Sequence, residues 1–140
     1  MTPKTFIKEV IGGFLYYARE LDCTMPCAIG SLASQQATPT QKTIKKVKQF
    51  FEYAASNPDA VVTYKASSMV LAEHSDVSYL SETKACSRAG GHFLRSANEI
   101  HPSNNGAILT VSQIIKAVMT STVEAELGAL YINAHEAFSL

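Results

Sequence analysis

The sequence predicts an α+β protein in which N-terminal helices are followed by a three-stranded antiparallel sheet and a C-terminal helix. Apolar residues recur at helical spacing in the first part of the chain, up to residue 55. Short extended segments separated by turn residues then follow between residues 69 and 111, and helical spacing returns from Thr122. Because strands joined by short turns pair antiparallel, these segments are expected to form one sheet.

Three helices are expected before the sheet, over residues 5–21, 26–36 and 41–55. Proline suits the first position of a helix, which favours a start at Pro26. The third helix is the most clearly amphipathic, because one face is apolar and lysines spread over the rest. These lysines are Lys42, Lys45, Lys46 and Lys48. They either contact a phosphate backbone or form a solvated face, and both interpretations stay open.

The extended segments are expected over residues 69–76, 89–95 and 107–111, and residues 61–64 are β-prone enough to add a short strand at the sheet margin. Ser103-Asn104-Asn105-Gly106 separates the last two segments, and Asn-Gly favours the positive φ of a hairpin turn. The pair Gly90-Gly91 leaves room for another part of the chain to approach closely.

The C-terminal helix is marked by a capping box at its start, in which Ser121 precedes Glu124 by three residues. Its apolar residues recur at helical spacing, so one face is expected to be buried. That stripe consists of Val123, Leu127, Leu130, Tyr131, Ala134 and Phe138. Glu126 lies on the flank of the stripe, and Asp76 lies where the first strand ends. A strand-end Asp facing a helix Glu predicts a metal site, whereas each residue alone reads as a turn residue or a surface charge.

Composition sets the remaining bounds. The 12 basic residues balance the 12 acidic ones, so nucleic-acid binding would depend on a local patch rather than on a global positive field. No apolar stretch reaches the roughly 20 residues that cross a bilayer, and the N-terminus lacks the pattern of a secretory signal. We therefore expect no membrane association and an intracellular location, cytoplasmic or nuclear.

The three cysteines, Cys23, Cys27 and Cys86, are an odd set without a second pair or a His-rich run to complete a zinc site. Reduced, structural thiols are the expected state.

Three long blocks of the sequence are HSDVSYLSETKACSRAGGHFL, NNGAILTVSQIIK and TSTVEAELGALYINAHEA. They resemble the ribonuclease H segment of Ty1/copia-type retrotransposon polyproteins. The preceding stretch, from IGGFLYYARELDC to NPDAVVTY, is similar to the segment that joins the reverse transcriptase to that nuclease. The resemblance implies a helical connection segment at residues 1–64 and an incomplete ribonuclease H-like module at residues 65–140.

The resemblance also implies a catalytic role. The first-strand Asp and the second Glu of the E-A-E block are metal-binding catalytic carboxylates in the family, and they match Asp76 and Glu126. Two Mg²⁺ ions held by carboxylates activate water and stabilise the leaving oxygen in this chemistry, and the substrate is an RNA–DNA hybrid. The sequence ends at Leu140, before the family's third and fourth acidic residues. We therefore expect weak Mg²⁺ binding at most and a catalytically silent chain.

Three interpretations follow. The chain is a silent ribonuclease H-like module that self-associates or binds a partner, a hybrid endonuclease completed by another chain, or a nucleic-acid binder that does not cleave. The third would use Lys42, Lys45, Lys46 and Arg88. In the ribonuclease H fold a later strand pairs with the first one, so its absence predicts a homo-oligomer formed through the free strand edge or through an uncovered helix face.

Overall fold

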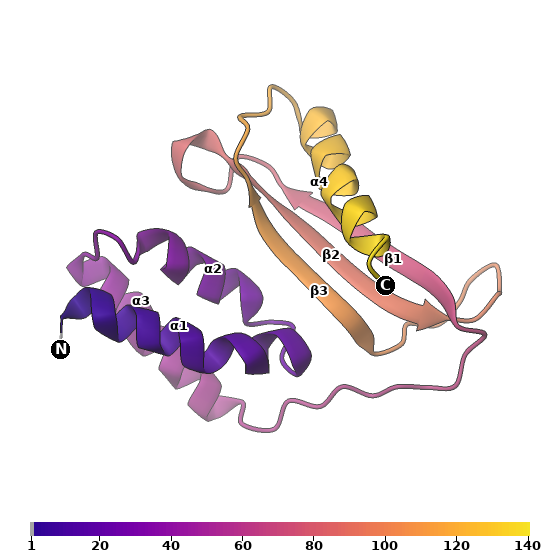
Figure 1. Ribbon diagram of the computed structural model, residues 1–140, viewed down its shortest axis with the longest axis horizontal. Coiled ribbons are helices and arrows are strands. Elements are labelled where there is room, and N and C mark those ends of the chain that lie inside the picture. The colour runs from indigo at the N-terminus through magenta and orange to yellow at the C-terminus, as the bar shows by residue number, and fades with distance from the viewer. Residues whose placement is uncertain (1) are drawn as a thin grey trace. The chain divides into compact units, whose positions relative to one another are not determined.

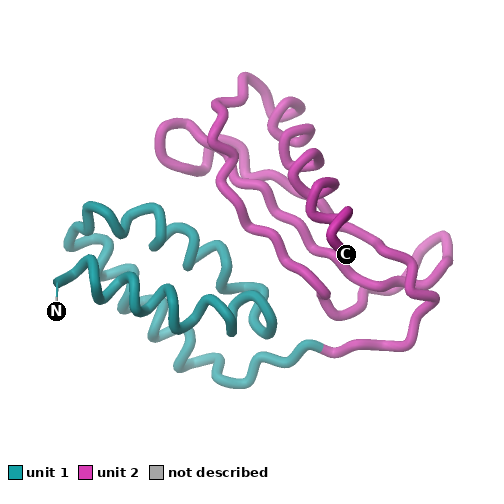
Figure 2. Tube along the Cα trace, viewed as in Figure 1, with its two compact units in different colours: residues 1–62 teal, residues 63–140 magenta. Residues whose placement is uncertain are grey.

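The computed structural model describes residues 2–140, in which helices precede and follow a three-stranded antiparallel sheet (Figure 1). This α+β architecture confirms the predicted order of elements. The chain divides into two compact units, one up to Val62 and the other from Thr63 to Leu140 (Figure 2). No helix within residues 2–140 is long and apolar enough to cross a bilayer.

The first unit consists of three helices: α1 (Pro3–Glu20), α2 (Pro26–Gln35) and α3 (Gln41–Ser56). A reciprocal capping box starts α3, because the Thr40 hydroxyl accepts from the Thr43 backbone N–H and the Thr43 hydroxyl accepts from the Thr40 N–H. Helix α3 packs its predicted apolar stripe inward. Phe50 meets Phe14 of α1 edge to face, with ring centroids 5.0 Å apart.

The apolar core of this unit is drawn from all three helices, and Thr43 is buried beside it. Its fully buried members are Ile7, Val10, Ala18, Met25, Ile29, Leu32, Val47 and Phe50. The helical spacing read from the sequence therefore matches the burial in α3, where Val47 and Phe50 lie on the inner side.

The second unit contains β1 (Val70–Ser78), β2 (Ser87–Ser96) and β3 (Ala107–Ile115), followed by α4 (Thr122–Ala137). A short 3-10 turn, η1 (Thr83–Ala85), lies between the first two strands. The strand order is β1-β2-β3, so β2 is central and β1 and β3 are edge strands. Asp76 pairs with Gly90, and Gly91 pairs with Val111.

The short strand expected at residues 61–64 is absent from the sheet, whose strands are β1, β2 and β3. This prediction is wrong because side chains, not a strand ladder, hold the end of that segment. The Tyr64 hydroxyl donates to the carbonyl of Ala107 at 2.8 Å, and the Lys65 N–H donates to the Asn105 side chain at 2.7 Å.

Helix α4 covers one face of the sheet, over β1 and β2 (Figure 1). Its buried residues are Ala125, Ala129 and Asn133, which recur every fourth position and form a narrow face of small and polar side chains. The expectation that the larger apolar stripe is buried is therefore wrong. Five of its members are exposed by half or more: Val123, Leu127, Leu130, Tyr131 and Phe138.

The physical reason for this orientation lies in the strand beneath the helix. A Cβ atom added to Gly91 would fall 2.8 Å from Cγ of Asn133, so the helix approaches closely only because Gly91 has no side chain. Ala89 and Ala129, which pack in the same cluster, are also small. The sheet thus accepts the small face of α4, and the bulky residues turn outward.

Candidate functional site

Asp76, the first predicted carboxylate, lies on the sheet face opposite α4. Its two neighbours in β1 both turn toward the helix. Ser75 accepts a hydrogen bond from Nδ2 of Asn133 at 2.8 Å, and Val77 packs against the cluster that contains Ala129. Because side chains alternate along a strand, Asp76 between them projects from the other face, where it is exposed.

Glu126, the second predicted carboxylate, lies in the first turns of α4 and is exposed. The preceding residue, Ala125, faces the sheet, so the Glu126 side chain leaves the helix about 100° away from that direction. The two carboxylates therefore start from opposite sides of the sheet. Within the described part of the chain, no three His, Cys, Asp or Glu side chains gather closely enough to hold a metal ion. The metal-binding roles of Asp76 and Glu126 stay predictions.

A histidine pair lies on the same sheet face as Asp76. His74 and His92 are paired across β1 and β2, with ring centroids 6.4 Å apart. Burial lowers the pKa of His92 below its usual 6.5, because the charged imidazolium loses water, and the nearby His74 lowers it further. Neutral His92 therefore contributes to the free energy of unfolding above pH 6.5. This stabilising contribution is lost as the pH falls from 6.5 through the lowered pKa.

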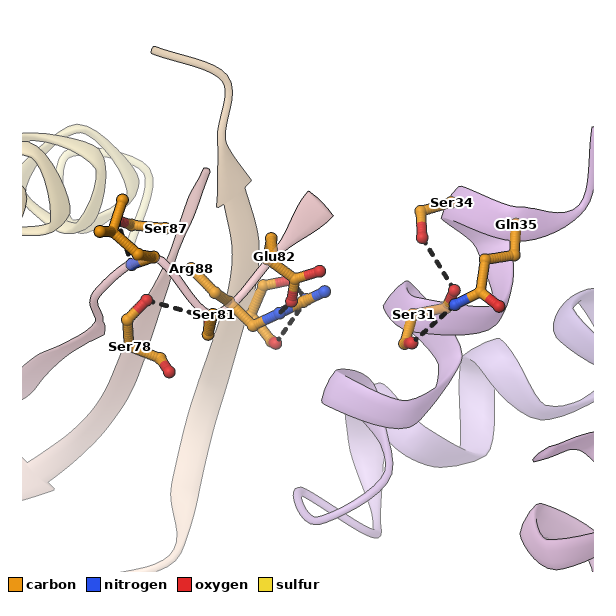
Figure 3. A network of polar contacts seen from close by, with 10 residues as sticks. Ser31, Ser34, Gln35, Ser78, Ser81, Glu82, Ser87 and Arg88 are labelled. Carbon is orange, nitrogen blue, oxygen red and sulfur yellow. Dashed lines mark hydrogen bonds and ion pairs between the residues drawn. The ribbon is translucent and has the colours of Figure 1, made fainter. Parts of the chain in front are cut away.

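Arg88 also belongs to this face, but its guanidinium is engaged within the chain (Figure 3). Nε donates to Oε1 of Glu82 at 2.6 Å, and Nη1 donates to the Ser112 hydroxyl at 3.2 Å. The residue is only 6% exposed. This buried arginine, held by a carboxylate, ties the loop before β2 to the sheet. Its contact with nucleic acid stays a prediction.

The lysines predicted to bind nucleic acid are placed differently from one another along α3. Lys42 and Lys45 are exposed. Lys46 is half-buried and lines a cavity of about 360 Å³ between α2 and α3, together with Met25, Leu32 and Phe50. Lys48 forms an exposed i,i+4 pair with Glu52 at 3.8 Å. Lys42 and Lys45 are thus the two that best fit a phosphate contact, and this role stays a prediction.

Asn133 is the polar residue that sequence reasoning overlooked. It is completely buried, and Nδ2 donates to both the Ser75 hydroxyl and the Gly90 carbonyl at 2.8 Å. Its spacing of four from Ala129 and eight from Ala125 was a readable signal, because the three together mark a helix face distinct from the bulky stripe. These two hydrogen bonds fix α4 against β1 and β2, the strands that carry Asp76 and Gly90.

Comparison of the chain with known proteins found no matching protein-family model, no matching curated protein and no matching solved structure. The resemblance to Ty1/copia polyproteins accordingly stays an expectation drawn from the sequence blocks.

Proposed function

We propose that residues 65–140 form a retrotransposon-derived, ribonuclease H-like module that does not cleave nucleic acid as an isolated chain and that acts by associating with a partner. The observation that carries this proposal is the placement of the two motif carboxylates. Asp76 projects from the sheet face opposite α4, and α4 carries Glu126.

Two-metal hydrolysis requires carboxylates that converge on ions only about 4 Å apart. Mg²⁺ adds the demand for near-octahedral oxygen coordination at about 2 Å. Carboxylates that leave opposite sides of a sheet do not meet this demand, and no third acidic, His or Cys ligand joins either of them within residues 2–140. The described residues therefore do not fit the metal pair.

The test is cleavage of a labelled RNA–DNA hybrid by the full chain with Mg²⁺ or Mn²⁺, alongside Asp76→Asn and Glu126→Gln. The matched controls are Asp59→Asn and Glu99→Gln, which change exposed carboxylates outside the motif. We expect no cleavage by any of the five proteins. Cleavage that is lost in the two motif variants and kept in the two controls would overturn the proposal and support an endonuclease completed by a second chain.

A second candidate function, binding of nucleic acid without cleavage, is favoured by the exposure of Lys42 and Lys45 on α3. Such binding weakens steeply with salt, because each neutralised phosphate releases about one counterion. Lys42→Gln combined with Lys45→Gln should lower the slope of log affinity against log salt by about 2. Lys48→Gln is the control, because Lys48 is paired with Glu52. Equal slopes in all variants would remove α3 from the binding surface.

A further inference from the structure

The cavity of about 360 Å³ between α2 and α3 opens onto the core of the first unit. Its floor consists of the core residues Met25, Leu32 and Phe50, each of them 5% exposed or less. Its rim includes exposed Ala28 and Gln49. This size, with an apolar floor and a few polar groups at the rim, is typical of a site for a small molecule.

One wall of the cavity is held by a chain of hydrogen bonds that joins α3 to the turn before α2. The Thr24 hydroxyl donates to the carboxylate of buried Asp22, and the Thr24 N–H donates to the same oxygen at 3.0 Å. Because the Thr24 hydroxyl proton is engaged there, the Tyr53 hydroxyl donates to the Thr24 oxygen, at 2.6 Å. A wall fixed in this way lowers the entropy cost of ordering the site when a ligand binds.

Lys46 carries the only charge among the described residues that line the cavity. It is half-buried and makes no ion pair within residues 2–140, whereas Lys48 on the same helix is paired with Glu52. An ammonium group donates and cannot accept, so its strongest partner is an anionic oxygen. Gln49 lies three residues further along α3, on the same side of the helix, and its amide adds a second donor.

A neighbouring hollow shows that this charge pattern is local. It has a volume of about 470 Å³ and shares Thr24 and Tyr53 with the cavity, but its lining also includes Asp22 and Asp59. Carboxylates in the lining repel an anion, and no lysine or arginine lines this hollow within the described residues. The cavity that holds Lys46 is therefore the better of the two for an anion.

We propose that the cavity between α2 and α3 binds a small organic monocarboxylate with an aliphatic or aromatic body. The body packs on Met25, Leu32 and Phe50, and the carboxylate accepts from the Lys46 ammonium and the Gln49 amide. One carboxylate matches one ammonium, whereas a phosphate dianion would leave a partly buried charge without a partner. The site belongs to residues 1–62, so it is independent of whether residues 65–140 cleave nucleic acid.

The test compares two probes of equal size, octanoate and octanamide, titrated into the full chain while backbone amide shifts are followed by NMR. Octanoate should shift the residues that line the cavity, with a dissociation constant of about 1 mM or tighter. Octanamide should bind about tenfold more weakly, because it lacks the charge that the Lys46 ammonium neutralises. The absence of a saturable shift around the cavity, or equal binding of the two probes, would overturn the proposal.

Two lysine variants test the contact with the carboxylate. Lys46→Met removes the charge and keeps an unbranched apolar stem, so it should weaken octanoate binding by about tenfold and leave octanamide binding unchanged. Lys45→Met is the matched control, because Lys45 is exposed on α3 and does not line the cavity. Equal losses in the two variants would place the anion on the exposed lysine face of α3 and overturn the assignment to the cavity.

Two leucine variants test the position of the body. Ala28→Leu adds bulk at the rim of the cavity and should weaken both probes, whereas Ser34→Leu adds bulk to an exposed position of α2 outside the cavity and should weaken neither. Circular dichroism checks that each variant is folded. Unchanged octanoate binding by a folded Ala28→Leu chain would show that the probe lies elsewhere and would contradict the proposal.

Discussion

Helices α3 and α4 have similar patterns of apolar residues, but α3 buries its apolar stripe and α4 exposes its own. Each has 16 residues, a hydroxyl N-cap and apolar side chains at helical spacing. Helix α3 turns its stripe inward, where Val47 and Phe50 are buried among residues of α1 and α2. Helix α4 turns its stripe outward and packs on the sheet through Ala125, Ala129 and Asn133.

The contrast shows that helical periodicity identifies a face to be covered but does not identify the surface that covers it. In the first unit the neighbouring helices offer large apolar side chains, such as Phe14, against which Phe50 fits. In the second unit the central strand offers Ala89 and Gly91, against which Ala129 and Asn133 of α4 lie closely. The partner surface therefore selects the face, and the bulky face of α4 is left exposed.

The largest expected effect on stability comes from Phe50→Ala in α3. Removing a buried aromatic side chain costs about 3–5 kcal/mol, because transfer energy is lost and a cavity remains. Urea unfolding followed by circular dichroism measures the loss. Phe51→Ala is the control, since Phe51 is 37% exposed and should lose much less. Equal losses in the two variants would contradict the inward packing of the α3 stripe.

Gly91→Ala tests the close approach of α4 to the sheet. The added Cβ would meet the Asn133 side chain, and overpacking of this kind costs about 1–3 kcal/mol. Gly90→Ala is the adjacent control, because its Cβ would find only the Asp76 carbonyl, at an ordinary 3.7 Å. A tolerated Gly91→Ala, measured by thermal unfolding, would mean that α4 is held less tightly than its small face indicates.

Much of the fold could be read from the sequence because local signals and tertiary structure agree. The capping residue Ser121 marks a helix start that the structure confirms. Strand β3 runs to Ile115, four residues beyond the predicted Val111, because polar Ser112 and Gln113 end the apolar run although they still pair with β2. Pairing between strands depends on residues of another segment, so the local sequence does not indicate where it ends.

The candidate site was less predictable than the fold. Sequence placed Asp76 on a strand and Glu126 on a helix, and both elements exist as expected. Which side of the strand faces the helix depends on where α4 docks, and that is decided by Gly91 and Asn133 rather than by either carboxylate. A shift of one residue in the phase of β1 would move Asp76 to the other face.

The N-cap hydrogen bonds of α3 and α4 should contribute equally to the free energy of unfolding, whichever face of each helix is buried. Thr40 accepts from the N–H of Thr43, and Ser121 accepts from the N–H of Glu124. Thr40→Ala and Ser121→Ala should each lower the free energy of unfolding by about 1 kcal/mol. Thr40→Ser and Ser121→Thr keep the hydroxyl and should lose far less. A cap loss confined to one helix would show that the other helix frays at its start in the folded protein.

The smallest effect is expected for Leu127→Ala, measured at a concentration low enough for the chain to be monomeric. Leu127 is large and belongs to the α4 stripe, yet its exposure leaves little contact to lose. Surface changes of this kind stay within about 0.5 kcal/mol, whereas truncation of a buried leucine costs about 2–5 kcal/mol. A loss in the higher range in the monomer would show that the stripe is covered within the chain. A loss that grows with protein concentration would instead place its cover on a second copy.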